Sequence, residues 1–231
     1  MKFVIAIDGP AGSGKTTTAR ESARELGMIY LDTGAMYRAA ALFMHRKGIE
    51  VLNENEVKKH LKDIDISFRN INNSRRIFLN SEDVSDAIRN EMISQKASEI
   101  STLKSVRFFL AGMQRKIGSI TDIVAEGRDM GTVVFPDAQL KFFMECSIEE
   151  RARRRAAEYR KDNPGISIDE IKKQIEIRDR RDRNRQYAPL KMADDAILIN
   201  TTNMTKEEQI KFVVSKAKKI RENIQSDTES S

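Results

Sequence analysis

The chain has 231 residues, of which 39% are hydrophobic and 33% are charged, so it can bury a core and is not disordered throughout. One cysteine, Cys146, and two histidines exclude an internal disulfide framework and a metal centre built from Cys or His, and they fit a reducing compartment. No apolar run approaches the ~20 residues of a membrane span, and the apolar start is too short for a signal peptide. We therefore expect a cytoplasmic protein that makes no membrane contact.

The charge is concentrated in one part of the chain. The net charge is +6, and the segment Glu150–Arg185 has 13 Lys or Arg against 8 Asp or Glu. A protein that binds single-stranded nucleic acid needs aromatic side chains among its basic ones, but this segment has only Tyr159 and the chain has no Trp. Arginine, which grips phosphate with two parallel hydrogen bonds, outnumbers lysine here. The segment is therefore expected to bind the phosphates of a small molecule.

Short apolar runs bounded by turn residues recur along the chain, with segments of helical period between them. They are Phe3–Ile7, Met28–Leu31, Asp122–Ala125, Leu140–Met144 and Ala196–Ile199. Buried strands that alternate with helices predict an α/β fold in three layers, in which helices cover both faces of a parallel five-stranded sheet. Ligands then bind at the edge where the strands have their carboxyl ends.

Two segments interrupt this alternation. Ile64–Phe68 and Arg76–Leu79 flank the turn-rich Asn70–Ser74, which predicts a small inserted antiparallel hairpin. The arginine-rich segment is predicted to form two helices around the turn Asp162–Gly165. Both are expected to be flaps over a site. The polar end from Gln225 to Ser231 is expected to be a frayed tail.

Gly9–Thr16 matches the phosphate-binding pattern G-x-x-x-x-G-K-[ST], and it lies between a predicted strand and a predicted helix at Thr17–Glu25. Glycines let successive backbone N–H groups turn toward phosphate oxygens, and the helix adds its positive end. Lys15 would bridge the β- and γ-phosphates, and the Thr16 hydroxyl would ligate Mg²⁺. An ordinary glycine-rich turn would not need the Lys-Thr pair. The predicted nucleotide-binding residues are Gly9, Pro10, Ala11, Gly12, Ser13, Gly14, Lys15, Thr16 and Thr17.

Charged residues follow two of the other predicted strands. Asp32 or Thr33 can cap a helix that runs through His45, with Arg38 one turn inside, where a phosphate could bind. A capped helix with a solvated arginine explains the same pattern equally well. Glu126 ends a buried strand where nucleotide-binding proteins of this kind hold Mg²⁺ through a carboxylate, and Arg128 and Asp129 come next.

Arg178, Asp182 and Arg185 share one face of a predicted helix because they are four and three residues apart. A solvated face held by salt bridges is the simplest interpretation of such a pattern. The local excess of positive charge instead favours binding of a nucleotide phosphate.

Several of these motifs together resemble the bacterial-type cytidylate kinases, over nearly the whole chain. The matching segments are Ile7–Thr16, Leu31–Arg38, Glu82–Ser85, Gly127–Pro136 and Arg178–Arg185. The Gly-Phe-Pro-Arg run of adenylate kinases and of eukaryotic-type UMP/CMP kinases is absent, and so is the Asn-Lys-x-Asp guanine reader of GTPases. Glu126 stands where many members have Asp, and Thr33 where Ser is frequent.

The resemblance implies a division of the chain into three parts. A CORE covers 1–62, 90–150 and 186–225, an NMP-binding domain is inserted at 63–89, and an arginine-rich LID with its adjoining helix covers 151–185. The composition adds a disordered tail at 226–231.

The resemblance also implies how a nucleoside monophosphate is bound. Ser98, Arg107 and Asp129 would read cytosine, Arg178 and Asp182 the ribose, and Arg38, Arg128 and Arg185 the acceptor phosphate, with Thr33 also in this site. Ser98 and Arg107 are nine residues apart, on opposite faces of a straight helix, so the helix must break. Ser101 and Thr102 could cap a second helix there.

The implied reaction transfers the γ-phosphoryl group of ATP to CMP, and also to dCMP, with Mg²⁺ and without a general base. The expected catalytic residues are Lys15, Arg128, Arg151, Arg155 and Arg185, of which Arg151 and Arg155 would close onto ATP. ATP and CMP would be the only partners of a monomer, and no nucleic acid would bind. Three alternatives stay open at this point: a slow P-loop switch, an RNA-binding protein, and a kinase for another small acceptor.

Overall fold

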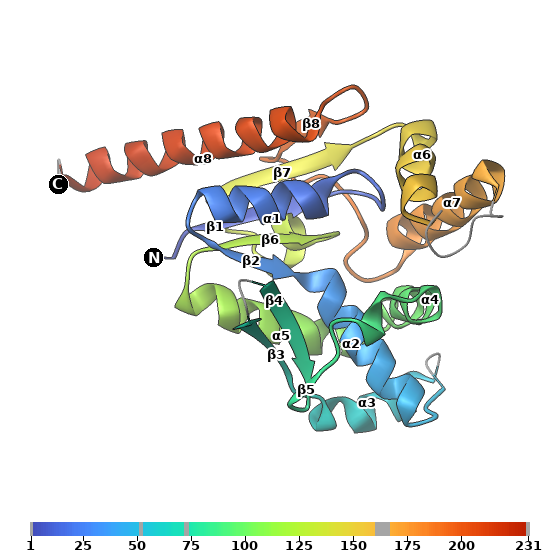
Figure 1. Ribbon diagram of the computed structural model, residues 1–231. Coiled ribbons are helices and arrows are strands. Elements are labelled where there is room, and N and C mark those ends of the chain that lie inside the picture. Colours follow the sequence, from blue (N-terminus) through green and yellow to red (C-terminus); the bar gives the residue numbers. More distant parts are fainter. Residues whose placement is uncertain (1, 51–52, 72–73, 160–166, 230–231) are drawn as a thin grey trace. The chain divides into compact units, whose positions relative to one another are not determined.

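The computed structural model describes residues 2–50, 53–71, 74–159 and 167–229 (Figure 1). The chain divides into two compact units, one made of Met1–Leu31 and Ile117–Ser231 and the other of Asp32–Lys116. We call them the first and the second unit. The expected insert 63–89 lies inside the second unit, which extends beyond it at both ends.

The predicted parallel sheet of five strands is confirmed, with the order β2-β6-β1-β7-β8. Its strands are β1 (Val4–Asp8), β2 (Ile29–Asp32), β6 (Ile123–Gly127), β7 (Leu140–Glu145) and β8 (Ile197–Asn200). β1 pairs in parallel with β6 and with β7, so that Asp8 lies between Gly127 and Phe143. The carboxyl ends of these central strands therefore share one edge.

One face of the sheet is covered by α1 (Lys15–Glu25) and α8 (Lys206–Glu229), which lie along β1 and β7 in Figure 1. Ile5, Ile7 and Phe142 are buried on this face. The helices contribute small side chains to this core, among them Ala19 and Ala23 of α1. Small side chains let a helix pack close to the sheet. This core fixes α1, and with it the loop that precedes it.

The arginine-rich segment forms the two expected helices, α6 (Ile148–Tyr159) and α7 (Ile168–Asn184). They pack through a small apolar cluster of Ala152, Ala156, Ile171 and Ile175. Ser167 caps α7, and the side chain of Glu170 bonds back to the Ser167 backbone. The turn predicted at Asp162–Gly165 lies outside the described residues.

The second unit contains the predicted hairpin, β3 (Ile66–Ile71) and β4 (Ser74–Leu79), which pair antiparallel. A two-residue strand, β5 (Glu82–Asp83), pairs with β4 and completes a three-stranded sheet. A strand this short has no periodic pattern, so the sequence does not predict it. The other elements begin or lie within this unit: α2 (Thr33–Arg46), α3 (Glu54–His60), η1 (Leu61–Asp63), η2 (Ala87–Arg89), α4 (Glu91–Ile100) and α5 (Lys104–Ile120).

The helix break expected between Ser98 and Arg107 is present, between α4 and α5. Ser101 and Thr102 were expected to cap the second helix, but their hydroxyls donate to the end of the first helix. Ser101 donates to the Ser98 carbonyl at 2.8 Å and Thr102 to the Glu99 carbonyl at 2.7 Å, so both hydroxyls satisfy carbonyls at the end of α4. At the start of α5, the Ser105 N–H donates to the carboxylate of Glu54 at 2.8 Å.

α8 continues to Glu229, whereas the composition predicts a frayed tail from Gln225. That expectation is wrong for residues up to Glu229. A helix that is already nucleated by packing on the sheet adds residues at little free-energy cost, even where their side chains are polar.

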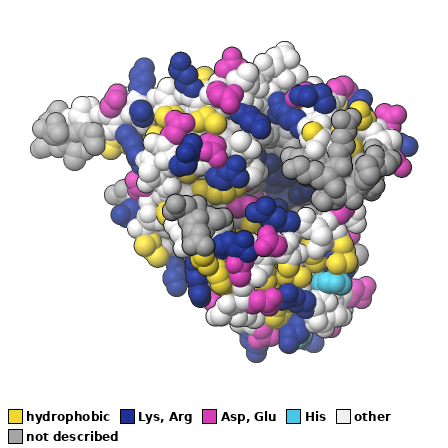
Figure 2. All heavy atoms as spheres, viewed as in Figure 1, with side chains coloured by type: hydrophobic (Ala, Val, Ile, Leu, Met, Phe, Trp, Pro, Cys, Tyr) yellow, Lys and Arg dark blue, Asp and Glu magenta, His cyan; other side chains and the backbone are white. Residues whose placement is uncertain are grey.

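Charged side chains of both signs are spread over the visible face of the molecule (Figure 2), in keeping with a third of the residues being charged. Among the described residues, no helix combines the length and the apolar character that crossing a membrane requires.

Candidate functional site

The loop after β1 has the backbone conformation that a phosphate cradle needs. Gly9 has φ 155° and Gly14 has φ 92°, both in the region that side chains with a Cβ rarely adopt. A Cβ on Gly9 would lie 2.4 Å from the Met144 carbonyl oxygen. Gly14 is the N-cap of α1, whose first turn has no acidic residue, so the positive end of the helix faces the loop without a competing carboxylate.

Lys15, at the start of α1, is buried, and its ammonium donates to the Pro10 carbonyl at 3.0 Å. Burial, together with the positive charge of Arg128, lowers the pKa of Lys15 to about 7. The Lys15 ammonium therefore titrates near neutral pH, and a bound phosphate would favour its charged form.

Thr16 and Glu126, the two predicted Mg²⁺ ligands, are in contact. The Thr16 hydroxyl donates to Glu126 at 2.9 Å, and the Tyr30 hydroxyl donates to the other carboxylate oxygen at 2.5 Å. Mg²⁺ prefers oxygen ligands and keeps several of its waters, so one hydroxyl and one carboxylate beside a phosphate loop fit it. Tyr30 was not predicted, because a tyrosine in a short strand carries no metal signal in the sequence.

Four of the predicted substrate residues come together in the first unit. Arg128 pairs with Asp182 at 2.8 Å, and Arg185 lies 3.7 Å from both Asp182 and Asp129. Asp182 is 4% exposed and Arg185 8%, which excludes a solvated salt-bridged face for this part of α7. Burial alone would raise the pKa of Asp182, but Arg128, Arg178 and Arg185 lower it, so the carboxylate stays charged.

This cluster is linked electrostatically to the phosphate loop. Arg128 and Arg178 both lower the pKa of Lys15, whereas Glu126 and Asp182 raise it. The cationic groups from β1–α1, β6 and α7 therefore act on one another within the first unit. Such a collection of buried positive charge suits the phosphates of a nucleotide.

Of the other predicted substrate residues, Arg178 also lies in the first unit, whereas Thr33, Arg38, Ser98 and Arg107 lie in the second unit. Asp32 caps α2 by accepting from the Ala35 N–H at 2.7 Å, and it pairs with Arg38 at 3.2 Å. The cap was one of two predicted, and Thr33 is buried directly after it. Because the Arg38 side chain is 27% exposed, it can still reach a ligand.

Ser98 and Arg107 are both buried, and both are hydrogen-bonded to Ser101 in the break between the helices. Ser101 donates to the Ser98 carbonyl, and its own carbonyl accepts from Arg107 Nη1 at 3.0 Å. The Arg107 guanidinium also lies over the Tyr37 ring, 5.7 Å from its centroid. The common role of Ser98 and Arg107 in reading cytosine stays a prediction.

Arg151 is held by the phosphate loop and by α7 in this structure, and its contact with ATP stays a prediction. It is 6% exposed, and its Nη1 donates to Asp179 at 2.6 Å and to the Ala11 carbonyl at 3.2 Å, while its Nε donates to the Cys146 carbonyl. These bonds fasten α6 and α7 to the phosphate loop. Arg155 is partly exposed, and its contact with ATP stays a prediction.

The cytidylate kinase family model matches residues 5–219. The chain belongs to the cytidylate kinase family.

Among curated relatives, the cytidylate kinase of Thermodesulfovibrio yellowstonii is 45% identical over 221 residues, which cover 94% of this chain and 98% of that protein. The cytidylate kinase of Fusobacterium nucleatum is 41% identical over 219 residues, 95% of this chain and 99% of that protein. A crystal structure of an uncharacterized protein from Eubacterium ventriosum superposes with a TM-score of 0.52 at 12% identity, covering 94% of this chain and 99% of that one. This last likeness shows the fold alone.

Sequence reasoning missed Thr201 and Arg154, which both donate to the Ser13 carbonyl of the phosphate loop, and Gln209, which contacts the helix that follows it. Thr201, directly after β8, donates to the Ser13 carbonyl at 2.8 Å, and Arg154 donates to the Thr201 carbonyl at 2.7 Å. Gln209 in α8 accepts from the Thr18 hydroxyl at 3.0 Å. The position of Thr201 at a strand end was a usable signal. Arg154 stands among adjacent arginines, and the sequence alone does not distinguish it from them.

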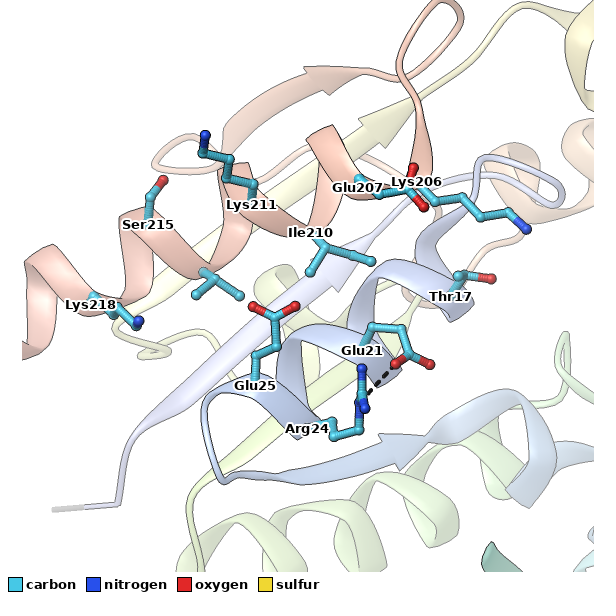
Figure 3. Close-up of a pocket in the computed structure, with 11 residues that line it drawn as sticks. Thr17, Glu21, Arg24, Glu25, Lys206, Glu207, Ile210, Lys211, Ser215 and Lys218 are labelled. Atoms are coloured by element: carbon cyan, nitrogen blue, oxygen red, sulfur yellow. Dashed lines mark ion pairs between the residues drawn. The ribbon is translucent and has the colours of Figure 1, made fainter.

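A hollow of about 690 Å³ lies between α1 and α8 (Figure 3). It is lined by charged side chains of both signs, including Glu21, Glu25 and Lys218. Thr17 is its one lining residue among those predicted to bind nucleotide. The hollow is therefore distinct from the candidate nucleotide site.

Proposed function

We propose that the chain transfers the γ-phosphoryl group of ATP to CMP, and also to dCMP, giving ADP and CDP or dCDP. The observation that carries this proposal is the electrostatic link between Lys15 of the phosphate loop and the buried cluster of Arg128, Asp182 and Arg185. Membership of the cytidylate kinase family supports the choice of acceptor. A loop that holds a triphosphate and arginines that hold a second phosphate are the two components that a nucleotide kinase needs.

The proposed mechanism uses no general base, because the attacking oxygen of CMP is already an anion. This oxygen attacks the γ-phosphorus of ATP in line, the bond to the bridging oxygen breaks, and its electron pair leaves on ADP. Lys15, Arg128 and Arg185 neutralise the charge that spreads over the transferred group. Mg²⁺, held through Thr16 and Glu126, would supply further positive charge to the phosphate oxygens.

Recognition of CMP is assigned to the residues that the family resemblance implies. Asp129 accepts from the exocyclic amino group of cytosine, while Ser98 and Arg107 bind its ring carbonyl and nitrogen. UMP has a carbonyl in place of that amino group, so the Asp129 carboxylate would face an acceptor and UMP would be rejected. Arg178 and Asp182 bind the ribose. The acceptor phosphate binds Arg38, Arg128 and Arg185, with Thr33 beside it.

Two arginines of α6 have roles in this proposal. Arg155 contacts ATP. Arg151 closes onto ATP with it, and it also holds the Ala11 carbonyl and so shapes the phosphate loop.

The test is an assay of ADP release with CMP, dCMP, UMP and AMP as separate acceptors. We expect ATP consumption to depend on CMP or dCMP and to be far slower with UMP and AMP. ATP hydrolysis at a rate that does not depend on any acceptor would instead identify a P-loop switch. Salt-sensitive RNA binding that is indifferent to ATP and CMP would identify the RNA-binding alternative.

We also propose that the enzyme works as a cytoplasmic monomer, with nucleotides as its partners and without nucleic acid. The single cysteine fits a reducing compartment, and the sparse aromatic residues of the arginine-rich segment disfavour RNA. Sedimentation at micromolar concentration would check the monomer.

A further inference from the structure

Two buried charged residues of the central strands take no part in the proposed mechanism. Asp8 ends β1 and is 4% exposed, and Lys141 in β7 is 7% exposed. Ile5 and Ile7 of β1 belong to the core under α1 and α8, and side chains alternate along a strand, so Asp8 points to the opposite face. In the sheet register Lys141 lies beside Ala6, which shares the face of Asp8. Burying charge on this face is unfavourable unless partners compensate for it.

The partners of Asp8 are two backbone groups far away in the sequence. One carboxylate oxygen accepts from the Met130 N–H and the other from the Gly131 N–H, each at 2.8 Å. Met130 and Gly131 begin η3 (Met130–Val134), a short helical segment that starts directly after Asp129. The first N–H groups of a helical turn have no partner within it, and Asp8 satisfies both of these.

The far end of the same segment is also held from the sheet. The Lys141 ammonium donates to the Pro136 carbonyl and pairs with Asp195 at 2.8 Å. A Cβ on Gly131 would lie 3.2 Å from Lys141 Cδ and 3.5 Å from Asp8 Oδ2, so the segment lies close against both side chains. The backbone between Asp129 and Pro136 is therefore fixed at each end by one buried charge.

Asp129 is buried directly before this segment. Its carboxylate lies 3.7 Å from Arg185, and its φ of −148° with ψ of 25° is not that of a regular helix or strand. We propose that Asp8 is a positioning residue for Asp129: by fixing the peptides of Met130 and Gly131, it sets the direction in which the Asp129 carboxylate meets the acceptor base. This inference rests on the proposed function, in which Asp129 reads cytosine.

A competing explanation is that Asp8 supports the phosphate loop, because it directly precedes Gly9. The hydrogen bonds of its carboxylate favour the segment after Asp129 instead, since both go to Met130 and Gly131. The two explanations predict that different substrates lose affinity, so steady-state kinetics can separate them.

The experiment replaces Asp8 by an isosteric amide, Asp8→Asn. The amide NH₂ now faces one of the two backbone N–H donors, so one hydrogen bond is lost and the segment after Asp129 loosens. Loss of one such bond weakens an interaction by roughly tenfold. We therefore expect the KM for CMP to rise, and the CMP/UMP ratio of kcat/KM to fall, by about this factor. The KM for ATP should stay within about twofold. A rise confined to the KM for ATP would overturn the inference.

The matched control is Lys141→Met, which removes the buried charge at the far end of the same segment. It should change thermal stability but leave the CMP/UMP ratio unchanged. Asp8→Asn should fold, because it removes a buried charge and keeps the shape of the side chain. Thermal unfolding checks this, and Asp8→Ser makes the same comparison if Asp8→Asn does not fold.

A double-mutant cycle with Asp129→Asn separates this inference from the proposed function. If Asp8 acts through Asp129, Asp8→Asn has no further effect on the CMP/UMP ratio in the Asp129→Asn background. An equal effect in both backgrounds overturns the inference, as does an Asp8→Asn variant with the wild-type ratio when Asp129→Asn alone has changed it. An unchanged ratio in Asp129→Asn alone would instead overturn the proposed reading of cytosine by Asp129.

Discussion

Lys15 shows most directly how a buried charge prepares a binding site. The pKa of Lys15 falls from 10.5 to about 7 because burial and the neighbouring Arg128 disfavour the ammonium. Glu126 and Asp182 oppose this shift and leave the group close to its titration midpoint at neutral pH. A bound triphosphate would add negative charge and stabilise the protonated form.

We therefore expect ATP binding at pH 8 to take up a proton, up to about one per site. Isothermal titration in buffers with different ionisation enthalpies measures this uptake. Lys15→Arg is the matched control, because a guanidinium is charged at every accessible pH and has no proton to gain. Equal uptake in both proteins, or none in the wild type, would contradict the assignment of the titrating group to Lys15.

At the scale of elements, α7 combines a capped beginning with a functional end. Ser167 and Glu170 form a reciprocal cap at the first turn, while Arg178, Asp182 and Arg185 lie near the last turns. Between them, Ile171 and Ile175 pack on α6. The cap and the packing thus stabilise the helix without touching the residues proposed to bind substrate.

Removal of the cap should therefore affect stability and spare catalysis. Ser167→Ala is expected to lower the free energy of unfolding by about 1 kcal/mol, because the Glu170 N–H loses its acceptor. Urea unfolding measures this, and kcat and KM should stay at wild-type values. Ser215→Ala, on an exposed turn inside α8, is the control and should be neutral or slightly stabilising. A marked rise in KM for either substrate in Ser167→Ala would show that the start of α7 takes part in binding.

At the scale of the whole molecule, Asp8 and Lys15 shape the dependence of stability on pH. Burial raises the pKa of Asp8 from 3.8 to about 7, so the folded state binds its proton more strongly than the unfolded state does. This contribution is complete below about pH 4 and is lost as the pH rises to 7. For Lys15 the unfolded state holds the proton more strongly, and stability increases from about pH 7 toward 10.5.

The summed contribution of Asp8 and Lys15 to the free energy of unfolding is therefore expected to be smallest near neutral pH. Asp8→Asn lacks the Asp8 contribution. Its free energy of unfolding, relative to that of the wild type, should therefore increase by at least about 1 kcal/mol as the pH rises from about 5 to 7. Chemical unfolding at a series of pH values measures the difference. A constant difference across this range would show that Asp8 does not titrate as its burial implies.

The sequence by itself determined the parts of this protein that are local or repeated. Each of the five strands is a short apolar run, and the phosphate loop is a contiguous pattern. The break between Ser98 and Arg107 follows from their spacing once the resemblance assigns both residues to the base. Local patterns of this kind reflect backbone preferences and burial on one face, which neighbouring residues are enough to express. The resemblance to cytidylate kinases rested on the same contiguous motifs.

Only the tertiary structure decided which charges are buried and what they contact. Spacing placed Arg178, Asp182 and Arg185 on one helical face, but a solvated face and a buried one have the same period. It did not distinguish Arg151, which fastens the phosphate loop, from Arg154 and Arg155 on the same helix. The bond from Met130 to Asp8 spans 122 positions, and no pattern within a helix or strand records a contact of that range. Such contacts depend on how the layers pack, because packing removes water and leaves each polar group the partners that the fold brings to it.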